Sequence, residues 1–149
     1  MKNTLRRFSR PAVLTLVFAA LASLSGVALA EKADRDKPTN VEANQMFYDE
    51  AKMINTFVGN VVLTRGTLIM HAEKLIVKQD AAGNQFATMY AAPGGITKFR
   101  QKRDGVDEYF EGYAQRIEYD GAKELVELFD RALLKRGQDE IRSNYVSYN

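Results

Sequence analysis

The apolar positions between residues 121 and 137 follow the spacing of one face of an α-helix. In the stretch GAKELVELFDRALLKRG they recur at i, i+3, i+4, i+7 and i+8, namely at Leu125, Leu128, Phe129, Ala132 and Leu133. Most residues of the stretch are good helix formers, and two basic residues precede the glycine that ends it, as at a helix C-terminus. Taken alone, this local pattern predicts a helix.

An internal repeat predicts a different structure for the same stretch. Shifting the chain by 71 residues aligns residues 43–66 with residues 114–137 without a gap, and eight of the 24 positions are identical. The first copy is rich in β-branched and aromatic residues around Gly59, which is typical of a strand, a bend and a second strand. Because tertiary context overrides local propensity, the repeat predicts two strands with a bend near Asp130 and a hairpin turn at Asp120-Gly121.

The rest of the chain has the pattern of an all-β protein. Apolar runs are separated about every ten residues by turn signals such as Gly83-Asn84, Pro93-Gly94-Gly95 and Asp104-Gly105. The predicted strands lie near residues 40–48, 53–58, 60–65, 67–79, 85–91, 95–102, 106–111, 113–119, 123–129, 131–136 and 140–148.

The first 30 residues are typical of a secretory signal peptide. Four basic residues precede an apolar run from Ala12 to about Leu24, and Ala28-Leu29-Ala30 supplies the small residues of a cleavage site. The apolar run is shorter than the roughly 20 residues of a membrane-spanning helix, and no Cys follows it to carry a lipid anchor. We therefore predict export with cleavage after Ala30, a mobile N-terminal segment over 31–39 and one domain over 40–149.

Charge and cysteine content narrow the function further. Loss of the four cations of the signal peptide changes the formal net charge from +2 to −2 and leaves 119 residues, which suits one domain. An exported chain with this charge balance is a poor candidate for nucleic-acid binding. Because the chain has no cysteine, neither disulfides nor thiolate metal sites can stabilise it. Stability must come from strand pairing and apolar burial.

The candidate catalytic side chains form no recognisable site. His71 is the only histidine, and no second His or Cys accompanies it to bind a metal. Asp104, Asp107, Glu108 and Glu111 could supply the carboxylate pair of a polysaccharide hydrolase, but they crowd one turn and its flanking strand. We therefore predict no catalytic residue, no metal and no cofactor. A hydrolase would need turnover that disappears when Glu108 or Glu111 is changed.

Three stretches resemble a known family. GNVVLTRGTLIMHAEKLIV, PGGITKFRQKRDG and EGYAQRIEYDGAK are similar to segments of the periplasmic lipopolysaccharide-transport proteins with an OstA-like domain, the LptA family, and the resemblance spans about residues 38 to 149. It implies a twisted, incompletely closed β-jellyroll of stacked antiparallel strands, with lipopolysaccharide acyl chains in an apolar groove. Family members usually continue for a few strands beyond the position of Tyr148, and a natural short form and a truncation are both compatible with this, so C-terminal docking stays open.

The same resemblance implies how such a protein acts. A carrier of this family bridges the inner-membrane and outer-membrane components of lipopolysaccharide transport, and its copies join by strand edges into a head-to-tail homo-oligomer. The alternative is a periplasmic β-scaffold that binds protein partners through its strand edges and carries no lipid. Bound lipid in the purified protein distinguishes the carrier from the scaffold.

Alternation along the strands predicts which side chains face the groove. With Glu118, Glu127 and Lys135 outward, their neighbours point inward, and the repeat transfers the assignment to the first copy. The inward positions predicted in this way are Met46, Tyr48, Phe57, Val61, Leu63, Ile117, Tyr119, Val126, Leu128, Ala132 and Leu134. The resemblance adds Val41 and Phe99 and places them, with Tyr119, near the acyl chains. An ordinary sandwich core would use the same residues, and this alternative stays open.

A basic run follows on the strand that carries Phe99. Lys98, Arg100 and Lys102 share the face opposite to Phe99, and Arg103 follows them. These cations could contact phosphates of a lipid headgroup at the groove rim. They could equally form a solvated strand face that discourages edge pairing. The residues alone do not decide between the two interpretations.

Overall fold

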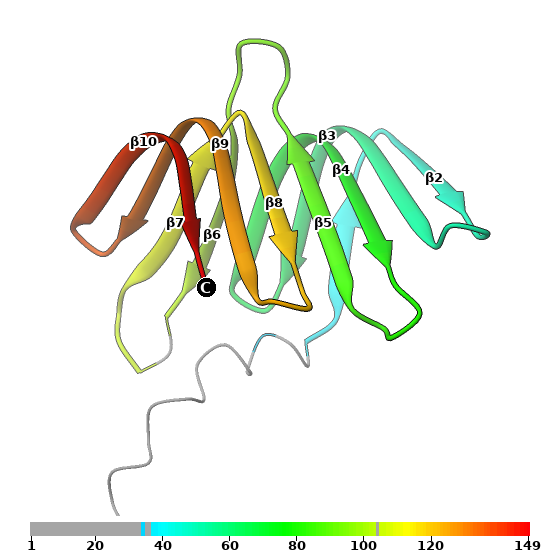
Figure 1. The fold of residues 1–149 in the computed structure, drawn as a ribbon, viewed down its shortest axis with the longest axis horizontal. Coiled ribbons are helices and arrows are strands. Elements are labelled where there is room, and N and C mark those ends of the chain that lie inside the picture. The colour runs from blue at the N-terminus through cyan, green and yellow to red at the C-terminus, as the bar shows by residue number, and fades with distance from the viewer. Residues whose placement is uncertain (1–33, 35–36, 104) are drawn as a thin grey trace, which may run out of the picture.

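The computed structural model describes residues 34, 37–103 and 105–149, which form ten antiparallel strands of one sheet (Figure 1). The strands are β1 Thr39–Glu42, β2 Gln45–Asp49, β3 Ile54–Arg65, β4 Leu68–Gln79, β5 Gln85–Tyr90, β6 Thr97–Lys102, β7 Tyr109–Ala114, β8 Arg116–Asp120, β9 Leu125–Arg136 and β10 Asp139–Tyr148. Within these residues, no helix is long and apolar enough to cross a membrane. The predicted all-β fold is confirmed, whereas the predicted signal peptide lies outside the described residues.

The long strands of the sheet all bend along one line, which we call the ridge, and the sheet therefore forms two layers (Figure 1). The long strands cross this ridge, so that their two halves pair with different neighbours. The first half of β4 pairs with β6 and its second half with β5, whereas the first half of β9 pairs with β8 and its second half with β7. One layer therefore contains β2, β5 and β8, and the other contains β1, β6 and β7. Most of the turns line the side opposite to the ridge, where the jellyroll is incompletely closed, whereas the loop between β5 and β6 projects beyond the ridge.

Left-handed backbone conformations bend the long strands at the same position of both repeat copies. Gly59 and Asn60 have φ angles of 80° and 49°, and Asp130 and Arg131, their repeat equivalents, have φ angles of 60° and 53°. Each pair lies at a register shift, where two residues oppose one residue of the neighbouring strand. Such a β-bulge bends its strand and increases the local twist. The bend predicted near Asp130 is confirmed, and the local helical pattern is overruled.

The bulges also correct two predicted boundaries. The strands predicted at 53–58 and 60–65 are one strand, β3, and those predicted at 123–129 and 131–136 are likewise one strand, β9. On both sides of each bulge the strand is paired with the same neighbour, β4 for β3 and β10 for β9, so the extra residues bend the strand without ending it.

Two other predicted strand boundaries differ from those observed, and both lie where the chain crosses the ridge from one layer to the other. The strand predicted at 40–48 is divided into β1 and β2, because the chain crosses the ridge between them and the N–H of Asn44 donates to the C=O of Gly59 over 2.9 Å. The break predicted at Gly112 lies instead at Gln115. Gly112 stays within β7 because it is paired with Phe99, whose ring occupies the space that a side chain at position 112 would need.

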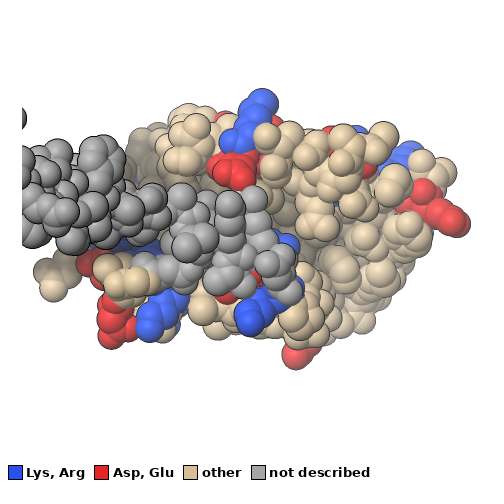
Figure 2. All heavy atoms as spheres, turned by 90° about the horizontal axis from the view of Figure 1, so that it is seen from below, with Lys and Arg blue, Asp and Glu red and all other residues tan. Residues whose placement is uncertain are grey.

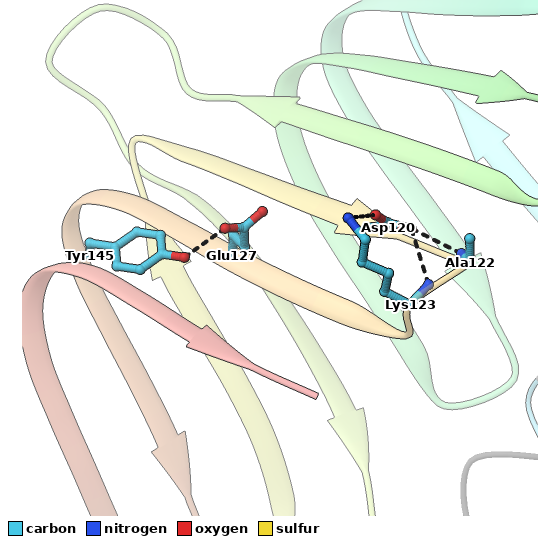
Figure 3. A network of polar contacts seen from close by, with 5 residues as sticks. All are labelled: Asp120, Ala122, Lys123, Glu127 and Tyr145. Atoms are coloured by element: carbon cyan, nitrogen blue, oxygen red, sulfur yellow. Dashed lines mark hydrogen bonds and ion pairs between the residues drawn. The ribbon is translucent and has the colours of Figure 1, made fainter.

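Polar contacts fix the turn between β8 and β9 and connect the side chains of β9 and β10 on the outer face of the sheet (Figure 3). Asp120 Oδ1 accepts hydrogen bonds from two backbone N–H groups of the turn, including that of Lys123 over 3.1 Å. The turn predicted at Asp120-Gly121 is therefore confirmed. The O–H of Tyr145 on β10 donates to Glu127 Oε1 on β9 over 2.6 Å, and its ring lies 5.3 Å from that of Phe129.

Replacing Gly59 by alanine is expected to destabilise the fold by about 2 kcal/mol or more. A left-handed conformation costs an L-residue roughly 1–2 kcal/mol, and the added Cβ would also lie 2.6 Å from Asn44 Nδ2. Gly94→Ala is the matched control, because Gly94 has a φ of 73° and nothing within 4 Å of an added Cβ. Urea unfolding of both variants separates the two effects. Equal losses would show that the contact with Asn44 contributes nothing.

Candidate binding groove

Apolar side chains from both layers fill the space beneath the ridge. The strand register places Ile117, Leu128 and Val146 side by side in one layer, and it places Phe99 opposite Met70 in the other. The buried members of this cluster are Val61, Leu68, Leu75, Met89, Phe99, Ala114, Ile117, Leu128, Ala132, Leu134 and Val146. Val61, Leu128 and Ala132, which lie within two residues of the bulges, are at most 2% exposed, so the two layers form a closed apolar core beneath the ridge.

Toward the turns, the packing leaves a cavity of about 110 Å³ between the layers. Both layers supply its walls, which are Asp34, Arg65, Leu68, Met70, Ala87, Met89, Phe99, Gln101, Ile117, Tyr119, Glu124, Val126 and Tyr148. Pockets that enclose a drug-sized ligand measure roughly 300–1,000 Å³, so a longer apolar chain needs the groups at the mouth to move. Basic and acidic side chains are interspersed around this side of the molecule (Figure 2).

Most residues predicted to face the groove point into the space between the layers. Val61, Phe99, Ile117, Leu128, Ala132 and Leu134 are buried there. Val41, Phe57, Leu63 and Val126 are partly buried and pack against them. Tyr119 lines the cavity, together with Phe99, Ile117 and Val126. The inward orientation is therefore as predicted, while contact of these residues with lipid stays a prediction.

Met46 and Tyr48 are placed differently from the other predicted groove residues. They pair with Phe57 and Asn55 across β2 and β3, so they belong to the same inner face. Nevertheless 55% of Met46 and 57% of Tyr48 are exposed, because β2 lies at the end of its layer. These two side chains extend the apolar inner face to the end of the sheet.

Five residues of the cavity wall that belong to the apolar cluster were not predicted from the sequence, namely Leu68 and Met70 on β4, Ala87 and Met89 on β5 and Tyr148 on β10. On β4, Ile69 is also apolar although 39% of it is exposed on the outer face, so the stretch shows no alternation. The strand register assigns Met70 to the inner face, because Met70 is paired with Phe99 on β6.

A buried carboxylate lies at the mouth of the cavity. Asp34 Oδ1 accepts a hydrogen bond from the N–H of Thr67 over 3.0 Å, and Oδ2 accepts from the Thr67 hydroxyl over 2.7 Å and from Gln101 Nε2 over 2.8 Å. Burial acts to raise the pKa of Asp34, but these hydrogen bonds and the charge of Arg65 outweigh it and lower that pKa. Asp34 is therefore ionised at neutral pH.

Lys98, Arg100 and Lys102 of the basic run lie on the outer face of β6, and carboxylates pair with Arg100, with Lys102 and with Arg103, which follows the strand. Arg100 Nε lies 3.3 Å from Glu111, Lys102 Nζ lies 2.9 Å from Asp107, and Arg103 lies 2.7 Å from Glu108. The hydrogen bond to Asp107 and its charge raise the pKa of Lys102. Lys98 is exposed on the same face. Contact of this run with lipid headgroups stays a prediction.

The residues considered as catalytic candidates make structural contacts through their backbone or side chains. The backbone C=O of His71 accepts a hydrogen bond from the Thr97 hydroxyl over 2.7 Å, and Thr97 is buried. Glu108 and Glu111, the possible hydrolase pair, are engaged by arginines. Across the described part of the chain, no group of three His, Cys, Asp or Glu side chains could hold a metal ion.

Comparisons with known proteins agree with this geometry. The family model described as "LptA/(LptD N-terminal domain) LPS transport protein" matches residues 40–149. The lipopolysaccharide export system protein LptA of Escherichia coli K12 is 32% identical over 136 residues, which is 91% of this chain and 72% of that protein. LptA of Haemophilus influenzae is 29% identical over 92% of this chain and 78% of its own length.

A solved structure has the same fold. It is that of LptH from Pseudomonas aeruginosa, described as the LptA-homologous periplasmic component of the conserved lipopolysaccharide transport device. It superposes with a TM-score of 0.70 at 23% identity and covers 77% of this chain and 78% of its own. The predicted jellyroll is thus confirmed by structural likeness. Because the family model covers residues 40–149, which is more than half of the chain, the chain belongs to the family of LptA and LptD N-terminal-domain lipopolysaccharide transport proteins.

Proposed function

We propose that this protein is a carrier that holds lipopolysaccharide acyl chains between its two layers while they pass between the membranes. The observation that carries this proposal is the apolar inner face. It continues through the strands of both layers and leaves a cavity on the side where the jellyroll is open. Each buried CH₂ group of an acyl chain is worth about 0.8 kcal/mol, so such a face favours lipid without any covalent chemistry. The proposed role is therefore not enzymatic.

The proposed location is the periplasm. The relatives are named as lipopolysaccharide export proteins, and LptH is described as a periplasmic component. Export would use the signal peptide, with cleavage after Ala30. The proposed partners are lipopolysaccharide and the inner-membrane and outer-membrane components of its transport.

The proposed assembly is a head-to-tail homo-oligomer. At one end of the sheet β1 and β2 are paired with β3, and at the other end β10 is paired with β9. Among the described strands, these three have a partner on one side only. Such edges can accept a further strand. The exposed Met46 and Tyr48 would then continue the apolar face into the next copy.

Photo-cross-linking from neighbouring positions of β8 tests the carrier function. A cross-linking residue at Tyr119, which lines the cavity, is expected to capture lipopolysaccharide in cells, as is one at Phe99. One at Glu118 is expected to capture at least about tenfold less, because successive side chains of a strand face opposite sides. The captured species is identified by immunoblotting against lipopolysaccharide.

The alternative function is a protein-binding scaffold without a lipid ligand. The closed apolar core beneath the ridge favours it, since that region needs no ligand to be stable. Equal capture from Tyr119 and Glu118 would contradict the groove, and capture from neither would favour the scaffold.

A further inference from the structure

The Asp34 carboxylate occupies a set of hydrogen-bond donors that would suit another anion equally well. We call the donor-bearing residues Arg65, Thr67 and Gln101 the anion cradle. Thr67 donates its N–H and its O–H, and Gln101 donates from its side-chain amide, so three donors converge on the two carboxylate oxygens. Asp34 is only 8% exposed, although it is charged. Such burial of a charge requires good compensation by donors.

Each part of the cradle is oriented by its surroundings. The Thr67 oxygen accepts the N–H of Lys102 over 3.2 Å, which leaves the hydroxyl proton free to point at the anion. Gly66 has a φ of 58°, and a Cβ there would collide with the Asp34 carboxylate, so the turn between β3 and β4 leaves room for an anion. Arg65 contributes positive charge, and its Nε is buried without a hydrogen-bond partner among the described residues.

The cradle adjoins the apolar cavity. Arg65 and Gln101 line the same cavity as Leu68, Met70 and Phe99, and Asp34 lies at its mouth. A molecule with an anionic group next to an acyl chain could therefore place the chain between the layers while its anion reaches the cradle. The small size of the cavity means that such a chain needs the groups at the mouth to move, and Asp34 is one of them.

We propose that the anion cradle binds a phosphate group of an acylated ligand, and that Asp34 occupies the cradle until the ligand displaces it. This inference rests on the proposed carrier function and adds to it a position for the lipid headgroup. A phosphate monoester carries a charge of about −1.5 to −2 and three strong acceptor oxygens. It can therefore use the three donors and the Arg65 charge more fully than a carboxylate does. Asp34 in turn satisfies the donors while the groove is empty.

Asp34→Asn and Gln101→Met in the full chain test this proposal. Asn keeps the shape of Asp34 but loses its charge, so the competitor of the phosphate is weakened. Met has nearly the shape of Gln but donates no hydrogen bond. Asp80→Asn is the matched control, because Asp80 also accepts three hydrogen bonds in a turn but is not part of the cavity wall. Circular dichroism of each variant checks that it is folded.

The probes are lipid A, which is the acylated and phosphorylated part of lipopolysaccharide, the same lipid without its phosphates, and inorganic phosphate. Gln101→Met is expected to weaken binding of phosphorylated lipid A by about tenfold, the worth of one charge-assisted hydrogen bond. Asp34→Asn is expected to strengthen the binding of phosphorylated lipid A several-fold, because the carboxylate charge that competes with the phosphate is lost. Calorimetry should show no change for the dephosphorylated lipid, and none for Asp80→Asn.

The outcomes separate this inference from the carrier function. Equal changes for both lipids would overturn the cradle and leave the carrier function intact, whereas no binding of either lipid by any variant would overturn both. Inorganic phosphate is expected to compete with phosphorylated lipid A for the Asp34→Asn variant. Phosphate binding at concentrations that leave lipid binding unchanged would make the cradle a site for free phosphate and would overturn the proposal.

Discussion

Phe99→Asp is expected to abolish capture of lipopolysaccharide while the protein stays folded. Phe99 is 5% exposed, lies opposite Met70 on β4 and lines the cavity. An unpaired carboxylate among apolar groups costs several kcal/mol unless it reaches water or becomes protonated. In the bound state the acyl chains would surround it, whereas in the empty protein it can turn toward the open side. The loss should therefore fall mainly on binding and less on folding.

Ile69→Asp is the matched control for this substitution. Ile69 belongs to the neighbouring strand and is paired with Arg100, but it lies on the outer face. The Ile69→Asp variant should capture as much lipopolysaccharide as the unsubstituted protein, because no acyl chain is expected on the outer face. Lipid that copurifies with each variant is quantified by mass spectrometry, and urea unfolding reports stability. A Phe99→Asp chain that simply fails to fold would indicate that the space around Phe99 is part of a closed core, as in the scaffold.

The conflict between the helical pattern and the repeat has a physical explanation in β9. Leu128 and Ala132 face the interior, where they are buried. Phe129, by contrast, lies on the outer face, where the Arg116 guanidinium stacks on its ring at 4.1 Å and Tyr145 packs beside it. Both faces of the strand are thus partly apolar, although Val126, Leu128, Ala132 and Leu134 keep the same inward alternation on both sides of the bulge. The repeat was the better guide because the bulge recurs in both copies.

Other features could not be predicted because they depend on contacts between distant residues. On β4 the inner face passes from Ala72 to Leu75, since a bulge on β3 lies opposite, and the adjacent charges Glu73 and Lys74 hide the change. The pairing of β4 with both β5 and β6, which creates the two layers, leaves no local trace. Asp34 lies in a charged stretch without periodicity, and only its long-range hydrogen bonds show its position.

Leu128→Ala is expected to cause a large loss of stability. Leu128 is 0% exposed and lies between Ile117 and Val146, which are also buried. Removing a buried leucine side chain typically costs about 2–5 kcal/mol, because the cavity that it leaves collapses only in part. Ile141→Ala is the control, since Ile141 also lies on the inner face but is 57% exposed at the end of β10. It should cost no more than about 0.5 kcal/mol.

The loss of stability caused by Leu128→Ala also shows how far the groove extends toward the ridge. If the region beneath the ridge is a closed core, as its burial indicates, the loss measured by urea unfolding should be the same with and without lipid A. If acyl chains reach the ridge, they would fill the new cavity, and lipid would restore part of the lost stability. A loss below about 1 kcal/mol in the lipid-free protein would fall outside the range for buried leucines. Such a small loss would indicate that the groove reaches the ridge and that the stability of the fold comes mainly from strand pairing.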